Sequence, residues 1–298
     1  MTRNRKTPAV IALCCAVAGV GLVGCDDEPS PATDAAGSSA SAEQALQGSK
    51  KIKVDGRSVH VSCSGRAAEG QPVVMLMHGG GDDVKKMAGF QKKLSKKNRV
   101  CSYDRLGAGT SDKPKKAQSI DDSGKVLNGV LDKVAGDNPV VLAGHSLGGL
   151  IAARFAPDHQ DKVAGLVLMD ATPPTQNADV KRDVPESADG PAAEVRDQFV
   201  AISSGQNPEK LVIRDGKVRS AGDIPVEVLK HGKQYLAEIP QYGKAMERSW
   251  SEGQKKWLKI SSNSSLATAS KSEHYIYVDE PGLAAKAVER VAAQAART

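Results

Sequence analysis

Short apolar runs recur along this 298-residue chain, and segments with helical periodicity separate them. The clearest runs cover residues 72–77, 139–143 and 163–169, and a polar residue or glycine follows each of them. Runs of this length without polar alternation suit strands that are buried on both faces of a parallel sheet. Because helical patterns over 83–96 and 119–135 lie between the runs, the chain is predicted to be an α/β protein with a mostly parallel sheet.

The rest of the pattern adds strands and helices on both sides of these runs. Alternating polar and apolar residues over 51–54 and 57–63 flank Asp55-Gly56, a pair typical of a hairpin turn. Further strands are predicted over residues 99–103, 224–229 and 266–269, and further helices over 150–156, 244–260 and 281–295.

The stretch from residue 172 to residue 222 lacks this regularity. It contains five prolines and only fragments of helical pattern, such as residues 192–202. An irregular insert of about fifty residues in a regular α/β domain is expected to be a cap or lid over a site.

The first residues are typical of an export signal. A short segment with three basic residues precedes an apolar run over 9–23, which is too short to span a bilayer comfortably. The run ends at Leu22-Val23-Gly24-Cys25, which resembles a bacterial lipobox, where the cysteine receives a diacylglycerol. We expect a lipoprotein signal peptide over 1–24, a lipid anchor on Cys25 and a location on the outer face of the cell membrane. The alternative is an ordinary secretory signal that contains a cysteine, and a secreted protein.

Residues 25–49 are expected to form a flexible tether between this membrane anchor and a folded domain over 50–298. The segment is rich in Ala, Ser, Gly, Pro and acidic residues, and its single large aliphatic side chain is Leu46. Such a composition cannot bury enough apolar surface to offset its ordering entropy. Of the five cysteines, Cys63 and Cys101 remain in the folded domain, outside the cytoplasm, where disulfides persist.

The basic character of the chain is modest once the signal is set aside. The formal net charge is +6, and it becomes +3 when the three basic residues of the signal leave. Paired lysines at 85–86, 92–93 and 96–97 follow the outer face of a predicted helix. A solvated helix face is favoured over a nucleic-acid patch, so no nucleic-acid partner is expected.

A candidate nucleophile lies between a buried strand and a helix. Gly144-His145-Ser146-Leu147-Gly148 fits G-x-S-x-G, a motif that places the serine on a strained turn. Glycines two residues to either side are needed because side chains there would collide with the neighbouring strand and helix. The N–H of Leu147 is one expected oxyanion donor, and the loop His78-Gly79-Gly80-Gly81 is expected to supply another, from Gly80.

The candidate base is His274, the one histidine late in the chain, after the last strand and before the last helix. It completes the order nucleophile, acid, histidine. The other five histidines are expected in different settings: His60 at the surface, His78 and His145 in structural roles, and His159 and His231 solvated in polar loops.

The candidate acid is Asp170, which ends the strand after the nucleophile helix, at the edge where ligands bind in such sheets. The other usual place for the acid is the stretch after Leu229. It holds no aspartate before Asp279, which leaves Glu238 and Glu247 as the alternatives.

At this point the chain resembles the α/β-hydrolase superfamily. The matching pieces are His78-Gly79-Gly80-Gly81, Tyr103-Asp104-Arg105 with Gly107 and Gly109, Gly144 to Gly149, Asp170, and Ser272 to Ile276. The resemblance implies an eight-stranded, mostly parallel sheet flanked by helices, with a cap insert after strand 6. Because the family's second and fourth strands are antiparallel neighbours, it also implies a Cys63–Cys101 disulfide. One residue departs from the family pattern: Glu273 stands where glycine often precedes the catalytic histidine, and it could favour protonation of His274 or point to solvent.

The expected activity is that of a serine hydrolase of the esterase or lipase type, which cleaves an ester or amide-type bond of a small molecule through an acyl-enzyme. The alternatives are a non-catalytic lipoprotein that binds a ligand or partner on the same fold, and an acyltransferase. No cluster of cysteine and histidine suggests a metal site, and no G-x-G-x-x-G follows a strand, so no cofactor is expected. The sequence indicates neither the oligomeric state nor the acyl length of the substrate.

Overall fold

A computed structural model of the chain describes residues 46–68 and 70–297. The predicted signal peptide, the lipid anchor at Cys25 and most of the predicted tether therefore lie outside the described residues. The first strand begins at Gly48, earlier than expected. Leu46 packs against the core, and its carbonyl accepts a hydrogen bond from Arg99. Residues 46–49 thus belong to the fold and not to the tether.

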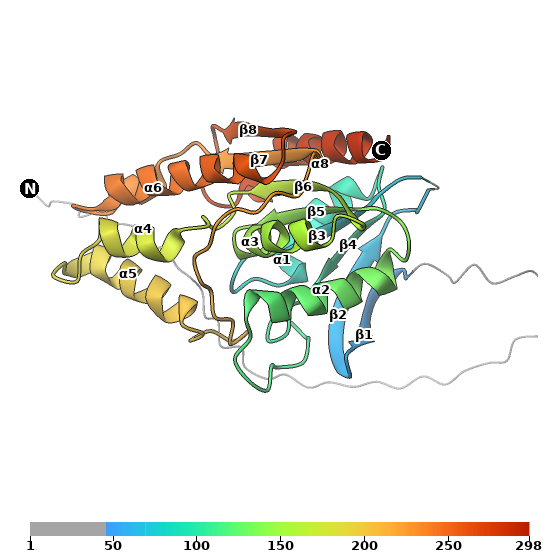
Figure 1. Cartoon of the computed structure of the whole chain (residues 1–298), viewed down its shortest axis with the longest axis horizontal. Coiled ribbons are helices and arrows are strands. Elements are labelled where there is room, and N and C mark those ends of the chain that lie inside the picture. Colours follow the sequence, from blue (N-terminus) through green and yellow to red (C-terminus); the bar gives the residue numbers. More distant parts are fainter. Residues whose placement is uncertain (1–45, 69, 298) are drawn as a thin grey trace, which may run out of the picture. The chain divides into compact units, whose positions relative to one another are not determined.

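One sheet of eight strands forms the centre of the described fold, in the order β1-β2-β4-β3-β5-β6-β7-β8 (Figure 1). β2 is antiparallel to both β1 and β4, and all other neighbours are parallel. The strands are β1 (Gly48–Val54), β2 (Arg57–Ser64), β3 (Val73–Met77), β4 (Val100–Tyr103), β5 (Val140–His145), β6 (Val163–Met169), β7 (Val226–His231) and β8 (Ser264–Ala269). The predicted mostly parallel, eight-stranded sheet is confirmed.

Helices cover both faces of this sheet. α1 (Val84–Leu94) and α8 (Pro281–Ala295) pack on one face, and α2 (Ile120–Val134) and α3 (Leu147–Phe155) pack on the other. β3 and β5 are buried along their whole length because both of their faces are covered. Shorter helices are η1 (Ala156–Asp158), η2 (Tyr235–Glu238), η3 (Trp257–Ile260) and α7 (Ile276–Asp279). Within the described part of the chain, no helix is both long enough and apolar enough to cross a membrane.

The helix boundaries follow local capping. Ser119 and Asp122 form a reciprocal capping box at the start of α2, which satisfies backbone N–H groups that the first turn leaves free. All six paired lysines, at 85–86 and 92–93 in α1 and at 96–97 just after it, are exposed. The expected solvated helix face is what the structure has.

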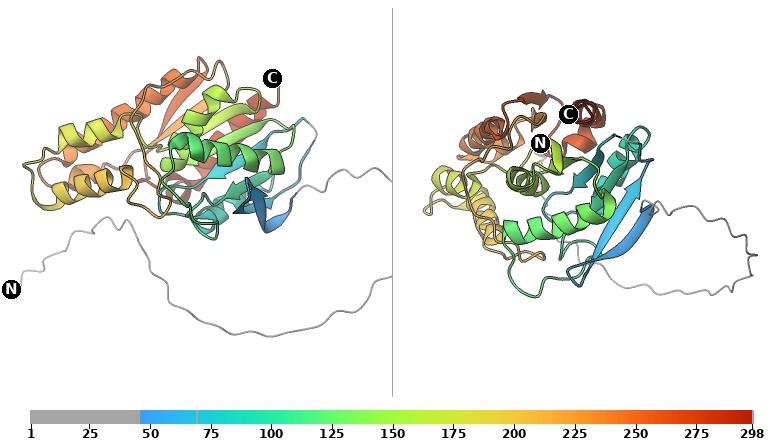
Figure 2. Two further views of the ribbon diagram at one scale, coloured as in Figure 1. Left: turned by 60° about the horizontal axis from the view of Figure 1, so that its bottom comes forward. Right: turned by 45° about the vertical axis from the view of Figure 1, so that its right-hand side comes forward.

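The irregular insert contains two helices, α4 (Gln176–Asp183) and α5 (Gly190–Ser203). They pack with α6 (Gly243–Lys256) beside one end of the sheet, as two views of the ribbon show (Figure 2). These three helices and η2 share a small apolar core of their own: Val184, Ala192, Leu236, Met246 and Trp250. The cap is thus built from the insert together with a helix that follows β7.

A disulfide joins Cys63 and Cys101, as the family resemblance implied. The two residues are directly opposite each other in the antiparallel pair of β2 and β4, and both are buried. The bond closes a loop of 38 residues.

Candidate active site

Ser146 lies on the sharp turn between β5 and α3. Its φ of 50° and ψ of −119° are strained for a residue with a side chain, and the residue is only half-buried. A Cβ added to Gly144 would lie 2.5 Å from the nitrogen of Gly149, and one added to Gly148 would lie 2.3 Å from the carbonyl oxygen of Met77. The glycines of the motif are therefore required by close backbone packing, as predicted.

The glycine-rich loop after β3 lies against the residue that follows Ser146. A Cβ added to Gly80 would meet the Leu147 side chain at 3.5 Å, and one added to Gly79 would lie 2.9 Å from the Nδ1 atom of His145. The two residues predicted to supply oxyanion donors, Gly80 and Leu147, are therefore neighbours beside Ser146.

His274 lies in the loop between β8 and α7, and its ring faces Asp170. The Nδ1 atom of His274 is 2.7 Å from Oδ2 of Asp170, so that Nδ1–H donates to the carboxylate and Nε2 is left for a reacting group. His145 donates from Nε2 to the carbonyl oxygen of His274, 3.0 Å away. Burial holds the pKa of His145 well below its usual value, so this ring is neutral. His145 thereby ties the His274 loop to the turn that carries Ser146.

Asp170 directly follows β6, with a φ of 45°, and it is fully buried. Besides His274, its carboxylate accepts hydrogen bonds from the backbone N–H and Nδ1 of His231 and from Nε1 of Trp250. Burial opposes ionisation of this carboxyl group, but the hydrogen bonds from His231 and His274 and their positive charge outweigh it. The pKa of Asp170 therefore lies well below its ordinary value, and the group is ionised.

The glutamates that were alternatives to Asp170 lie elsewhere. Glu238 is exposed on η2, and Glu247 is buried on α6 but contacts His231 instead of His274. The carboxylate against His274 is that of Asp170.

Backbone hydrogen bonds bring Ser146 to the same place. The N–H of Ser146 donates to the carbonyl of Met169, and the carbonyl of Ser146 accepts from the N–H of Thr172. These two residues flank Asp170 closely in the chain. Ser146, Asp170 and the His274 loop therefore converge where β5 and β6 end.

The prediction for His231 is wrong. We expected a solvated loop residue, but His231 is the last residue of β7 and is buried. Its Nδ1 is 2.8 Å from Oδ2 of Asp170, and its Nε2 is 2.8 Å from Oε1 of Glu247. Burial alone would lower the pKa of His231, but the hydrogen bonds and charges of the two carboxylates raise it to about 9. Its place just after the strand predicted over residues 224–229, at the edge of the sheet where ligands bind, was the signal for this position.

A buried ion pair was also missed by the sequence analysis. The Arg105 guanidinium makes two hydrogen bonds of 2.7 Å with the carboxylate of Glu209, from the cap insert. The same guanidinium donates to the carbonyls of His78 and Gly79 at 2.7 and 2.9 Å. Arg105 thus binds the backbone of the glycine-rich loop and joins this loop to the cap.

The other histidines have structural surroundings. His60 was expected at the surface but is half-buried, with Nδ1 2.7 Å from Oδ2 of Asp104. His159 was expected to be solvated but is half-buried, and its ring stacks on Phe155 at 3.8 Å. In the residues that the structure describes, no group of three or more His, Cys, Asp or Glu side chains is arranged to hold a metal ion.

Glu273 is exposed, and its carboxylate lies 3.7 Å from Nζ of the exposed Lys233. The sequence left open whether Glu273 acts on His274 or points to solvent, and in the structure its side chain points to solvent.

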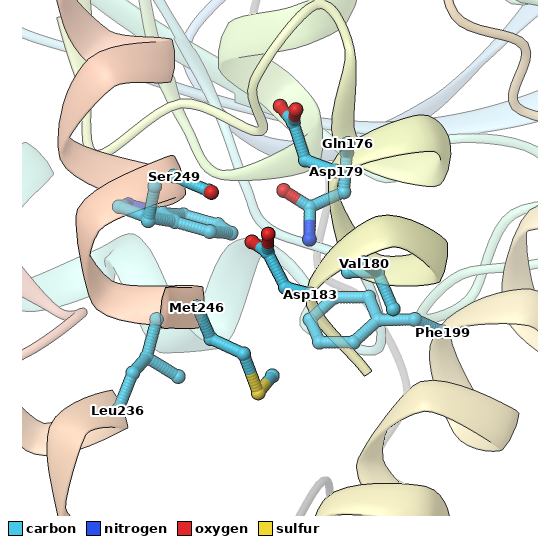
Figure 3. Close-up of a pocket in the computed structure, with 9 residues that line it drawn as sticks. Gln176, Asp179, Val180, Asp183, Phe199, Leu236, Met246 and Ser249 are labelled. Carbon is cyan, nitrogen blue, oxygen red and sulfur yellow. The ribbon is translucent and has the colours of Figure 1, made fainter. Parts of the chain in front are cut away.

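A narrow cavity of about 10 Å³ lies within the cap, between α4, α5 and α6. Figure 3 shows Asp179, Asp183, Phe199 and Met246 around it. Trp250 lines the same cavity, and its Nε1–H donates a hydrogen bond to Oδ1 of Asp170.

Comparison with known proteins identifies the family of this fold. Residues 72–220, half of the chain, match the family described as alpha/beta hydrolase fold. An uncharacterised protein of Mycobacterium tuberculosis (strain ATCC 25618 / H37Rv) is 34% identical over 117 residues, which are 39% of this chain and 33% of that protein. A pimeloyl-[acyl-carrier protein] methyl ester esterase of Photorhabdus laumondii is 34% identical over 105 residues, 35% of this chain and 38% of the esterase. The chain thus spans about a third of the length of these curated relatives.

Solved structures show the same architecture. A serine hydrolase involved in carbazole degradation superposes with a TM-score of 0.59 at 17% identity, over 82% of this chain and 97% of that one. At this identity the likeness shows the fold alone. With the family match over half of the sequence, it establishes that the chain belongs to the α/β-hydrolase family.

Proposed function

We propose that the protein is a serine hydrolase in which Ser146 is the nucleophile, His274 the base and Asp170 the acid. The observation that carries the proposal is the 2.7 Å contact between His274 and Asp170, beside a serine on a strained turn. A carboxylate on Nδ1 holds the imidazole in the tautomer whose Nε2 accepts the serine proton, and it stabilises the imidazolium that forms.

The reaction proceeds in two halves. Nε2 of His274 takes the hydroxyl proton as Ser146 Oγ attacks a carbonyl carbon, and the proton then passes to the leaving group. Water attacks the resulting acyl-enzyme, with His274 again as base, and releases the acid. The N–H groups of Leu147 and Gly80 stabilise the oxyanion in both halves, a contribution of about 3–4 kcal/mol for one donor.

The proposed substrate is a small-molecule ester, with an amide-type bond as the wider class. The match to a methyl ester esterase supports this chemistry, although it covers about a third of that protein.

The test is covalent labelling with a fluorophosphonate, followed by turnover of p-nitrophenyl esters of increasing acyl length. Labelling at Ser146, and its loss together with turnover in Ser146→Ala, is the expected result. Full activity in Ser146→Ala would overturn the assignment. A protein that neither labels nor turns over any ester would instead fit a ligand-binding role, and transfer of the acyl group to an added alcohol in preference to water would fit an acyltransferase.

We further propose that the protein is exported and anchored through a lipid on Cys25, on the basis of the sequence Leu22-Val23-Gly24-Cys25. When the wild-type protein is expressed in a bacterium fed with an alkyne fatty acid, it should carry the alkyne label and be found in the membrane fraction. Cys25→Ala should lose the label and the membrane association. Unlabelled wild-type protein in the culture medium would support ordinary secretion instead.

A further inference from the structure

The proposed reaction uses one face of the Asp170 carboxylate, but three of its four hydrogen bonds come from groups with no part in that reaction. Oδ1 accepts from the His231 backbone at 3.2 Å and from Trp250 at 3.0 Å. Oδ2 accepts from His274 and also from the ring of His231. The His231 ring therefore donates to the same carboxylate oxygen, Oδ2, that accepts from His274.

The contact made by the second nitrogen of the His231 ring indicates that the ring is positively charged. Nε2 lies 2.8 Å from Oε1 of Glu247, so both ring nitrogens face carboxylate oxygens. A neutral imidazole has one N–H and one lone pair, and the lone pair would then point at a carboxylate. Two protons on the ring remove this repulsion, and the pKa of about 9 agrees with an imidazolium.

Among the residues that the structure describes, the two ring nitrogens of His231 contact only the carboxylates of Asp170 and Glu247. Asp170 comes from the end of β6, Glu247 from α6 and His274 from the loop after β8. The ring of Tyr235, on η2, lies 4.9 Å from the His231 ring at an angle of 59°. Burial raises the pKa of its phenol well above the usual value, so it is uncharged. The exposed pair formed by Lys233 and Glu273 lies further out at the surface.

We propose that His231 and Glu247 are positioning residues for the proposed reaction: Glu247 holds the His231 ring doubly protonated, and the ring and backbone of His231 fix the Asp170 carboxylate so that Oδ2 faces His274. The inference rests on the proposed function, because it assigns the two residues to the orientation of its acid. Neither residue touches the reacting atoms.

The arrangement keeps the charge that catalysis needs. A lone imidazolium beside Asp170 would cancel the negative charge that stabilises a protonated His274. Glu247 restores it, so Asp170, His231 and Glu247 together carry one net negative charge. Because all three are buried, hydrogen bonds between them are stronger than in water and their geometry is correspondingly rigid.

The test compares Glu247→Gln with Glu227→Gln. Glu227 is on β7, the strand that carries His231, and its carboxylate binds Arg290 at 2.6 Å outside the site. The control thus removes a carboxylate from a partly buried ion pair without touching His231. We expect kcat at pH 7 to fall on the order of 10-fold to 100-fold in Glu247→Gln with little change in KM, and to stay within about twofold in the control.

The pH profile separates positioning from a general loss of stability. In the wild type, kcat should fall on the alkaline side as His231 loses its proton, near its pKa of about 9. In Glu247→Gln this alkaline limb should move to lower pH because the ring has lost one of its two carboxylates. Glu227→Gln should keep the wild-type limb.

Nitrogen NMR of the histidine-labelled wild-type protein gives a readout independent of turnover and of any variant. The ring nitrogens of His231 should keep imidazolium shifts through pH 8, and a neutral ring at pH 7 would overturn the inference. So would Ser146-dependent turnover in Glu247→Gln that matches the control in rate and pH profile. That result leaves the proposed function intact, whereas a wild-type protein whose Ser146 never labels removes both.

Discussion

At the scale of single residues, the proposed acid is defined by which carboxylate the structure places against His274. Asp170 directly follows β6, and the last residue of β7, next to the other usual place for an acid, is His231. The imidazole there binds the carboxylate from the neighbouring strand. The two positions therefore act on the same side chain instead of competing for the same role.

This predicts a large effect of Asp170→Asn on turnover. The amide cannot accept hydrogen bonds from both histidine rings as the carboxylate does, so the His274 tautomer is no longer held. We expect kcat to fall by about 10⁴-fold. Steady-state kinetics with a p-nitrophenyl ester measures this.

The matched control is Glu238→Gln, the exposed alternative from the sequence analysis, which should keep kcat within about twofold of wild type. A severe loss in Glu238→Gln with an active Asp170→Asn would reverse the assignment.

At the scale of elements, the Arg105–Glu209 pair joins the cap insert to the loop after β3. The approach is close, since a Cβ added to Gly107 would lie 2.4 Å from the carbonyl oxygen of Pro208. Hydrogen bonds between Gln118 and residues 209–212 hold the same returning segment of the insert. This part of the cap is therefore fixed to the loop that carries Gly80.

Breaking this pair should cost both stability and activity. Glu209→Gln leaves the Arg105 charge buried without its partner, and we expect a loss of about 3–5 kcal/mol in the free energy of unfolding. Urea denaturation measures this loss, and turnover should fall in the same variant because the glycine-rich loop loses its support.

The exposed pair of Lys97 and Glu289 is the comparison: Glu289→Gln should change the stability by less than about 1 kcal/mol. Equal losses in the two variants would contradict the special role of the buried pair.

At the scale of the whole molecule, the disulfide between β2 and β4 constrains the unfolded chain. Closing a loop of 38 residues should stabilise the fold by about 3–4 kcal/mol. The double variant Cys63→Ser/Cys101→Ser is expected to unfold at correspondingly lower denaturant while keeping its activity at low temperature, since the bond joins β2 to β4 and β3 separates β4 from β5, the strand that leads to Ser146. An unchanged unfolding midpoint on reduction of the wild type would contradict this.

The buried cluster of Asp170, His231 and Glu247 should make the free energy of unfolding depend on pH. The pKa of His231, about 9, is above its ordinary value near 6.5, so its contribution is complete below pH 6.5 and is lost as the pH rises toward 9. The pKa of Asp170 is lowered, so its contribution is present above about pH 4 and is lost as the pH falls. Stability from the cluster is thus greatest in mildly acidic solution.

The difference in unfolding free energy between wild type and Glu247→Gln isolates this effect, because most other titrations cancel. It should be largest near pH 6 and shrink toward pH 9.5. A difference that grows with pH would show that His231 is not held protonated in the fold.

The sequence by itself determined the sheet and the sharp turn that carries Ser146, and it singled out His274 as the candidate base. Apolar runs such as residues 163–169 read correctly as buried strands because a strand covered on both faces needs no polar alternation. Gly144 and Gly148 were interpretable because backbone contacts exclude any side chain there. Such requirements act between residues near in the chain, so a local pattern records them. Errors were mostly small, as at α3, which begins at Leu147 and not at residue 150.

The tertiary structure alone decided which charged groups meet. Arg105 and Glu209 are 104 residues apart, and Asp170 and His231 are 61 apart. Neither pair leaves a periodic trace, because a single polar residue in a loop has the same local pattern whether it faces solvent or a buried partner. Burial and a partner of opposite charge come only with the packing of β6, β7 and the cap, and these are what give His231 its proton and its place beside the acid.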